Sequence, residues 1–168
     1  PGQVNSTPKP ETLAAQAMGR VAEPYGDIAP PIYTSTTYER AADLSSPGGR
    51  VYSRDQNPTY DQAERLLAAL EGGSEALLFA SGNAAAVAVF QALKPGERIV
   101  APRHMYWALR RWLVEAGGRA GLLVDFFDNS DQDDLARAAR AAPTALIWLE
   151  TPANPTWEIT DIAAAAAL

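Results

Sequence analysis

Short apolar runs alternate with stretches of helical spacing from residue 75 to residue 168. Apolar runs between turn signals are typical of buried strands, and apolar residues three or four positions apart are typical of helices. We expect strands at 75–80, 98–101, 122–127 and 145–150, and helices at 84–93, 106–116, 132–141 and 161–168. Strands that alternate with helices pair in parallel and carry the helices on the faces of the sheet. The pattern therefore predicts an α/β fold with a mainly parallel sheet flanked by helices.

Residues 1–50 differ from the rest of the chain, because they are rich in Pro, Gly, Ser and Thr. This composition favours an extended N-terminal arm over a packed core. Within the arm we expect one helical stretch near 11–20 and an ordered extended segment at 30–38. A helix at 61–70 then ends at Gly72-Gly73. Because the chain ends inside a helical pattern, we interpret 51–168 as the incomplete first part of an α/β domain.

The overall composition narrows the classes of partner. The net charge is −6 and the isoelectric point is about 4.8, which argues against nucleic acid, because Lys and Arg drive binding to the phosphate backbone. No apolar run approaches the roughly 20 residues of a membrane span, and the first residues lack the apolar centre of a signal peptide. The chain has no cysteine and one histidine. We expect a cytoplasmic protein that uses neither a disulfide nor a histidine metal cluster.

Polar groups follow each expected strand at its carboxyl end. In parallel sheets, ligands bind in the crevice beyond these ends. The candidates there are Ser81-Gly82-Asn83, the stretch 103–106, Asp128-Asn129 and the stretch 150–154. The pattern predicts that several polar and aromatic side chains converge on one crevice.

Two of the motifs are suited to phosphate. The turn Ser81-Gly82-Asn83 opens a helix, whose first N–H groups and partial positive charge attract anions. Upstream, Tyr52 offers a hydroxyl donor, and Arg54 offers a charged guanidinium that can donate paired hydrogen bonds. Taken singly, such a turn is often only a tight connection, and such an arginine is more often a solvated surface charge. Together they suggest a small phosphorylated cofactor.

The other candidates have ordinary interpretations of their own. Tyr106 alone would be a half-buried aromatic at a helix start, and Asn154, between two prolines, would be a turn former. Glu150 is harder to dismiss, because a carboxylate at a strand end faces the crevice. We expect His104 to be a surface residue.

Several blocks in order resemble one family of enzymes. They are PPIYTSTTY at 30–38, YSRDQNPT at 52–59, LEGG at 70–73, SGNAA at 81–85, APRHMY at 101–106, ETPANP at 150–155 and DIA at 161–163. This series is similar to the Cys/Met-metabolism family of pyridoxal-phosphate (PLP) enzymes, which includes cystathionine γ-synthase, cystathionine lyases, methionine γ-lyase and O-acetylhomoserine sulfhydrylase. The resemblance implies the fold-type-I PLP architecture, of which these residues would be an N-terminal part.

The resemblance also implies roles for matching residues. The turn Ser81-Gly82-Asn83 would bind the PLP phosphate, and Tyr106, the candidate catalytic residue, would stack on the pyridine ring. Glu150 would help to arrange the site, and Asn154 would lie near the 3-hydroxyl group of PLP and the substrate carboxylate. Tyr52 and Arg54 would reach the PLP phosphate of a neighbouring subunit, in a homo-oligomer such as a homotetramer.

Two groups that the family needs are not assigned. The chain has only two lysines, Lys9 in the arm and Lys94 in a turn, and neither suits the lysine that forms a Schiff base with PLP. We expect that lysine, and the aspartate that pairs with the pyridine nitrogen, to lie beyond these residues. Trp107 stands where the family has glycine after the tyrosine, which predicts a different substrate side of the site.

The resulting hypothesis is PLP-dependent elimination or replacement at Cγ or Cβ of a sulfur- or oxygen-substituted amino acid. A second hypothesis is a non-catalytic fragment or homologue that binds the cofactor phosphate and needs a partner chain for the Schiff-base lysine. A third is a nucleotide-binding α/β domain. It ranks last, because the chain has neither G-x-G-x-x-G nor G-x-x-x-x-G-K-[ST].

Overall fold

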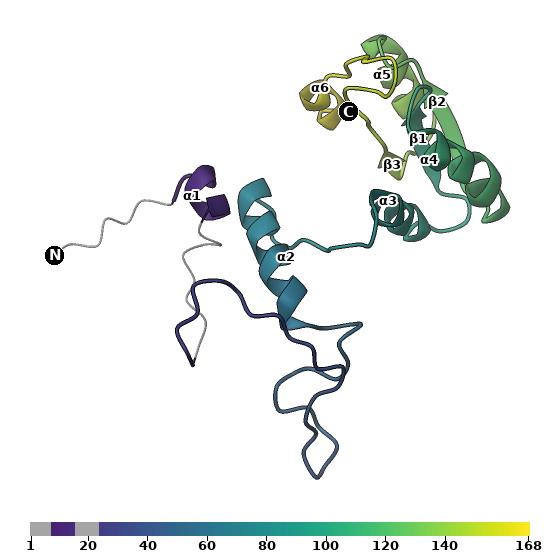
Figure 1. The fold of residues 1–168 in the computed structure, drawn as a ribbon. Helices are drawn as coiled ribbons and strands as arrows, with labels where there is room; N and C mark the ends of the chain where they lie inside the picture. The colour runs from purple at the N-terminus through teal and green to yellow at the C-terminus, as the bar shows by residue number, and fades with distance from the viewer. Residues whose placement is uncertain (1–7, 16–23) are drawn as a thin grey trace. The chain divides into compact units, whose positions relative to one another are not determined.

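The computed structural model describes residues 8–15 and 24–168 (Figure 1). They belong to two compact units, which meet in the sequence between Leu78 and Phe79. We call the first the arm unit and the second, residues 79–168, the sheet unit, and each is described by itself. None of the helices in the described ranges has the length and apolar character that a membrane crossing requires.

The arm unit contains two helices, α1 (Pro10–Ala15) and α2 (Pro58–Glu71). Helix α2 begins after Asn57, whose side-chain oxygen accepts the N–H of Thr59 at 2.8 Å, and a proline occupies its first position. It ends at Gly72, which has the left-handed backbone (φ 66°) that suits glycine. The helical stretch expected near 11–20 is confirmed for 11–15, and its remainder lies outside the described residues.

The sheet unit contains three parallel strands, β1 (Arg98–Pro102), β2 (Leu123–Phe127) and β3 (Leu146–Ile147), in the order β2-β1-β3. Ile99 pairs with Val124 on one side and with Leu146 on the other. The parallel sheet expected from the alternating pattern is thereby confirmed.

Helices alternate with the strands in the sheet unit, beginning with α3 before β1 (Figure 1). Their bounds are Gly82–Gln91 for α3, Trp107–Trp112 for α4, Gln132–Arg140 for α5 and Ile162–Ala166 for α6, with the π-helical turn η2 at Leu113–Gly117. Ser81, Asp131 and Asp161 cap the starts of α3, α5 and α6 with side-chain oxygens. Each cap satisfies N–H groups that a helix start leaves without partners.

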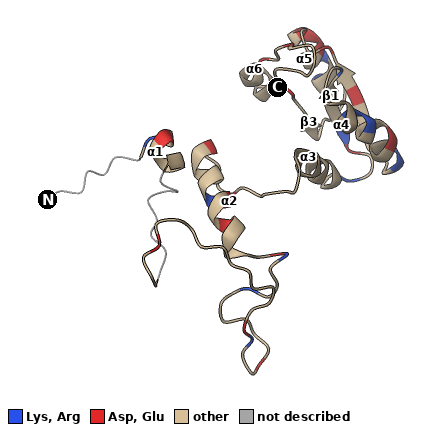
Figure 2. Cartoon of the chain, viewed as in Figure 1, with Lys and Arg blue, Asp and Glu red and all other residues tan. Residues whose placement is uncertain are grey.

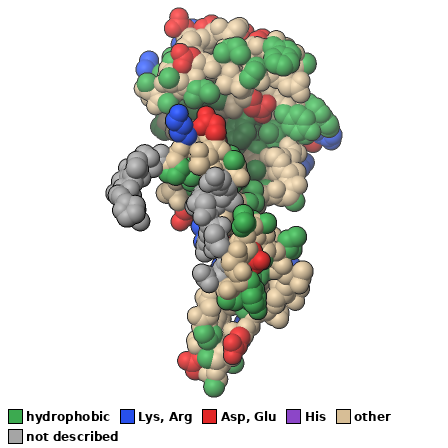
Figure 3. Space-filling view, turned by 60° about the vertical axis from the view of Figure 1, so that its left-hand side comes forward, with side chains coloured by type: hydrophobic (Ala, Val, Ile, Leu, Met, Phe, Trp, Pro, Cys, Tyr) green, Lys and Arg blue, Asp and Glu red, His purple; other side chains and the backbone are tan. Residues whose placement is uncertain are grey.

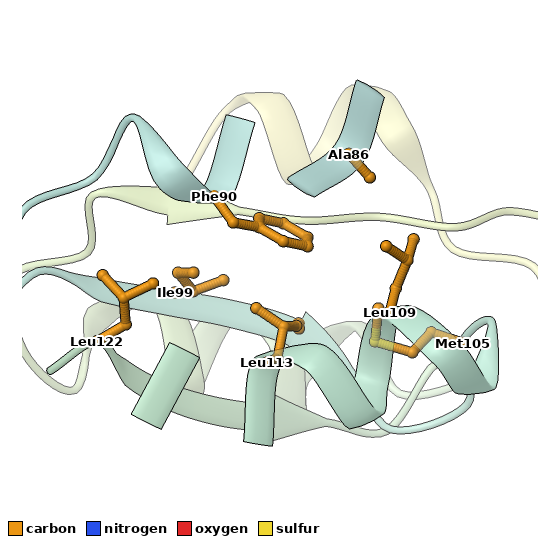
Figure 4. Packing of buried hydrophobic residues seen from close by; sticks show 8 residues of the cluster. Ala86, Phe90, Ile99, Met105, Leu109, Leu113 and Leu122 are labelled. Carbon is orange, nitrogen blue, oxygen red and sulfur yellow. The ribbon is translucent and has the colours of Figure 1, made fainter. Parts of the chain in front are cut away.

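Side chains alternate between the two faces of β1 and so build two apolar clusters. On one face, Ile99 packs with Phe90 of α3 and Leu113 beyond α4, and all three are fully buried (Figure 4). On the other face, Val100 packs with Phe127 and with Leu135 of α5. The sheet is therefore covered by helices on both faces, as the sequence predicts.

Two expected strands differ from the structure. The strand predicted at 75–80 is wrong, because these residues pair with no strand in the described part of the chain. The N–H of Leu78 donates instead to Oε1 of Glu64 at 2.9 Å. The strand predicted at 145–150 is shortened to Leu146–Ile147, although the N–H of Trp148 still donates to the carbonyl of Val100 at 2.8 Å.

The helix that follows β1 also differs at its end. We expected it to end at residue 116, just before Gly117-Gly118, but helical structure continues to Arg119. Gly118 has right-handed helical angles (φ −59°, ψ −42°), so it does not act as a stop. The turn is made by Gly121 instead, which has φ 82° and lies against Pro95.

Candidate active site

Glu150 and Tyr106 come together beyond the carboxyl end of the sheet. The N–H of Tyr106 donates to Oε2 of Glu150 at 2.7 Å, and Nε1 of Trp148 donates to Oε1 at 3.2 Å. Both carboxylate oxygens therefore accept hydrogen bonds from the protein. Glu150 is half-buried, and 42% of Tyr106 is exposed. The carboxylate thus holds the backbone of Tyr106 while the tyrosine remains partly open to solvent.

The loop between β1 and α4 is anchored at each of its residues. The N–H of Arg103 donates to the carbonyl of Phe127 at 2.8 Å, and Met105 is buried in the cluster around Phe90. The loop therefore fixes the backbone position of Tyr106, which is the N-cap residue of α4.

Asn129 provides a further anchor of this loop. Its Oδ1 accepts the N–H of His104 at 3.0 Å, and its Nδ2 donates to the carbonyl of His104 at 2.6 Å. The residue is 3% exposed. We expected a polar group at 128–129 but not this pairing, because a two-bond contact to a loop depends on tertiary proximity that no spacing encodes.

The start of α3 is open to an anion. The hydroxyl of Ser81 accepts the N–H of Ala84 at 3.1 Å, so it is already used as the cap. The N–H groups of Gly82 and Asn83 have no acceptor among the described residues. A Cβ built at Gly82 would meet nothing within 4 Å. Helix α3 carries no charged side chain (Figure 2), so the partial positive charge that the helix itself contributes at its start comes from its dipole.

The start of α3 lies toward the same end of the sheet as the Tyr106 loop. In Figure 4, Ala86 of the first half of α3 lies above Leu109 and Met105, whereas Phe90 lies above Ile99. β1 runs from Ile99 toward Met105. The first half of α3 therefore lies on the Met105 side of the sheet unit, and Glu150 meets the Tyr106 loop beyond the carboxyl end of the strands.

Asn154 lies four residues after Glu150 and is exposed. Its side chain has no hydrogen-bond partner in the described part of the chain. The neighbouring Ala153 is 2% exposed, and its N–H donates to the carbonyl of Glu158 at 2.9 Å. The backbone around Asn154 is therefore fixed while its amide remains available.

Tyr52 and Arg54 belong to the arm unit. The guanidinium of Arg54 lies 5.0 Å from the centre of the Tyr52 ring, a cation–π contact that holds the two groups together. Tyr52 also forms an isolated antiparallel bridge with Thr37. Arg54 makes no ion pair among the described residues, so its charge remains available to an anion.

His104 takes part in a polar cluster next to the site. Its Nδ1 lies 2.8 Å from Oε2 of Glu158, which also accepts the hydroxyl of Thr156 at 2.7 Å. The Thr156 hydroxyl first, and His104 second, lower the pKa of Glu158 from its ordinary value of 4.5. The expectation that His104 is a surface residue agrees with its side-chain exposure of 49%, but its contact with Glu158 was not predicted.

The residues present fit a phosphorylated ring such as PLP. Two free N–H groups at a helix start suit a phosphate, an exposed aromatic face suits a planar ring, and an available amide suits a hydroxyl or a carboxylate. Of the two lysines, Lys94 is exposed in the turn that precedes β1, at the amino end of that strand, and Lys9 is exposed before α1 in the arm unit.

Comparison with known proteins decides the family. The sequence pattern of the family described as Cys/Met metabolism PLP-dependent enzyme matches residues 11–168. The chain belongs to this family. It is 39% identical to human cystathionine gamma-lyase over 138 residues, which is 80% of this chain and 33% of that protein. It is also 39% identical to cystathionine beta-lyase of Coxiella burnetii over 142 residues, 82% of this chain and 35% of that protein.

Solved structures of the family agree with this fold. The crystal structure of metB from Corynebacterium glutamicum is similar with a TM-score of 0.88 and 36% identity, over 96% of this chain and 42% of that one. Cystathionine gamma synthase from Xanthomonas oryzae pv. oryzae, solved in complex with cystathionine, gives a TM-score of 0.86 and 30% identity, over 96% of this chain and 43% of that one. The architecture is that of fold-type-I PLP enzymes, and the 168 residues span about a third to two fifths of the length of these relatives.

Proposed function

We propose that the protein to which these residues belong catalyses PLP-dependent elimination or replacement at Cγ or Cβ of a sulfur- or oxygen-substituted amino acid. The observation that carries the proposal is the joint placement of an open helix start and the Glu150-held Tyr106 at one end of the sheet. The names of the relatives, cystathionine lyases and synthases, support a cystathionine-type substrate.

In this proposal, the residues of this chain bind and orient the cofactor. The N–H groups of Gly82 and Asn83 hold the phosphate, and the ring of Tyr106 lies against the cofactor ring. Glu150 fixes the backbone of Tyr106 through the 2.7 Å bond. Asn154 contacts the 3-hydroxyl group of the cofactor or the substrate carboxylate. When bound, PLP supplies an electron sink for bond breaking next to the amino-acid Cα.

The reactive lysine belongs to a segment outside these 168 residues, because Lys94 is exposed at the amino end of β1 and Lys9 is exposed in the arm unit. Tyr52 and Arg54 serve a neighbouring subunit's cofactor in a homo-oligomer, and the protein works in the cytoplasm. The alternative, a non-catalytic homologue that borrows its lysine from a partner chain, is not favoured, because the relatives are named as lyases and synthases.

Gly82→Val tests the phosphate site. Outside its own helix and its chain neighbours, a Cβ at Gly82 meets no atom within 4 Å, so the fold has room for the added side chain. In this proposal the valine side chain would crowd the phosphate at the helix start. We expect the dissociation constant for PLP, measured by fluorescence quenching on the intact protein, to rise at least about tenfold, the loss of roughly one charged hydrogen bond.

Gly118→Val is the matched control, because a Cβ at Gly118 also meets nothing within 4 Å and Gly118 is likewise helical. It should leave the dissociation constant for PLP unchanged. Equal PLP binding by Gly82→Val and the wild-type protein would refute the helix-start site. Absence of any PLP binding by the wild-type protein would refute the proposed function as a whole.

A further inference from the structure

The carboxamide of Asn129 pairs with a single backbone residue through two hydrogen bonds. It accepts from the N–H of His104 and donates to the carbonyl of the same residue, at 3.0 and 2.6 Å. Because the backbone of His104 offers one donor and one acceptor, only one orientation of the carboxamide satisfies both. Beyond the end of the β1–β2 ladder, the Asn129 side chain thus makes the two backbone hydrogen bonds that a residue of a neighbouring strand would otherwise make.

The backbone of Asn129 is hydrogen-bonded as well. It is 3% exposed, and its backbone carbonyl accepts the hydroxyl of Thr160, also 3% exposed, at 3.1 Å. The N–H of Thr160 donates to the Thr151 hydroxyl at 3.0 Å. Asn129 therefore joins the loop after β2 to the loop after β1 through its side chain, and to the segment before α6 through its backbone.

The contact lies two residues from Tyr106. Between them stands Met105, which is 5% exposed and packed in the cluster around Phe90. With His104 fixed by Asn129 and the Tyr106 N–H held by Glu150, the loop has a hydrogen bond or a buried side chain at every residue. The backbone position of Tyr106 is then set before any ligand binds, which lowers the ordering cost of binding.

We propose that Asn129 is a positioning residue: its carboxamide fixes the loop that presents Tyr106 to the cofactor. This inference rests on the proposed function for the role of Tyr106, but the positioning itself is a property of the loop.

The test measures two quantities on Asn129→Ala and Asn129→Asp. The first is the hydrogen-exchange rate of the Tyr106 amide, whose own acceptor Glu150 is untouched by either change. The second is the dissociation constant for PLP. We expect both to increase about tenfold. Asn129→Asp keeps the volume of the buried side chain but replaces the donor to the His104 carbonyl with an oxygen, so it remains informative if Asn129→Ala fails to fold.

Thr160→Val is the matched control. It removes the bond to the Asn129 carbonyl at a site that is equally buried, but it leaves both bonds of the carboxamide to His104. We expect it to lower stability and to change neither the Tyr106 exchange rate nor the PLP affinity by more than about twofold. A purely structural role of Asn129 would make the three variants behave alike.

An unchanged Tyr106 exchange rate in both Asn129 variants would overturn the inference, and so would faster exchange with unchanged PLP affinity. Failure of the wild-type protein to bind PLP would overturn the proposed function, and the Tyr106 exchange rate would still decide whether Asn129 holds the loop.

Discussion

The arm unit and the sheet unit achieve their structure by different means. In the sheet unit, Phe90, Ile99, Leu113, Phe127 and Leu135 are fully buried. Among the described residues of the arm unit, only Ala68 is buried. The arm unit instead exposes large apolar side chains, which include Tyr25 at 87%, Ile28 at 86% and Ile32 at 81%. Apolar side chains reach the surface in both units (Figure 3), but only the sheet unit also has a core.

Polar contacts organise the arm unit in place of a core. The N–H of Tyr33 donates to the Thr59 hydroxyl at 2.9 Å, and Nδ2 of Asn57 donates to the carbonyl of Tyr33 at 3.2 Å. Arg50 and Asp61 form an ion pair at 2.5 Å. Such exposed or half-buried polar contacts contribute little free energy each, whereas burial of a large apolar side chain contributes about 1.5–3 kcal/mol. The sheet unit is thus stabilised by burial of apolar side chains, whereas the arm unit relies on polar contacts and has Tyr52 and Arg54 at its surface.

The largest effect is expected in the core of the sheet unit. Phe90→Ala removes a fully buried ring that packs edge-on against Trp148, with centroids 4.9 Å apart. We expect the free energy of unfolding to fall by about 3–5 kcal/mol. Denaturant unfolding followed by tryptophan fluorescence measures this, because Trp148 lies beside the cavity.

Val89→Ala is the control for this change, because Val89 is the neighbouring residue of α3 and is 44% exposed. Its cost should be under about 1 kcal/mol. Similar losses for the two variants would show that the cluster around Phe90 is not what stabilises the sheet unit.

A smaller effect, on binding and not on folding, is expected in the arm unit. Arg54 makes no ion pair among the described residues and only stacks on Tyr52. Arg54→Ala should change the free energy of unfolding by less than about 0.5 kcal/mol. It should raise the dissociation constant for PLP by roughly tenfold, because a charged donor to the phosphate is lost.

Arg50→Ala is the matched control, since it removes an arginine of the same unit that pairs with Asp61. It should lower stability by up to about 1 kcal/mol without a change in PLP affinity. Unaltered PLP affinity in Arg54→Ala would remove Arg54 from the site and leave the arm unit without a binding role.

The smallest effect is a pH dependence in the sheet unit. The folded pKa of Glu158 is lowered by Thr156 and His104, so the carboxylate stabilises the fold above its ordinary pKa of 4.5. This contribution is lost as the pH falls through the folded pKa. The melting temperature of the wild-type protein should therefore decrease more steeply below pH 4.5 than that of Glu158→Gln.

Glu115→Gln serves as the comparison variant, because it removes an exposed carboxylate that pairs with Arg111 and does not touch His104 or Thr156. Its melting temperature should follow that of the wild-type protein over the same pH range. Parallel curves for the wild-type protein and Glu158→Gln would show that the contact with His104 and Thr156 carries no stability.

Local patterns predicted much of the sheet unit. The turn at Ser81 was recognisable as a helix start, and the helix at 132–141 and the strands β1 and β2 followed from local patterns, because these features depend on neighbours in the sequence. The strand expected at 75–80 failed for the opposite reason. Its residues have an apolar strand composition, but a strand needs a partner, and in the described structure Leu78 bonds to the side chain of Glu64.

In the candidate site, too, the sequence predicted some features and not others. Gly82, Tyr106 and Glu150 were predicted from motifs, and their roles toward the cofactor stay predictions. The 2.7 Å bond between Glu150 and Tyr106, the pairing of Asn129 with His104 and the cluster around Glu158 were not predicted. Each joins loops that are 25 to 54 residues apart in the sequence.

The sequence by itself determined the alternation of helices with β1, β2 and β3, the turn at Gly82 and the family, because each depends on adjacent residues or on blocks that match relatives. Only the tertiary structure decided which polar side chains hold the loop of Tyr106. The physical reason is that a buried carboxamide or carboxylate takes whichever partner the packing of the sheet brings within hydrogen-bond distance, and that proximity is a property of the folded chain.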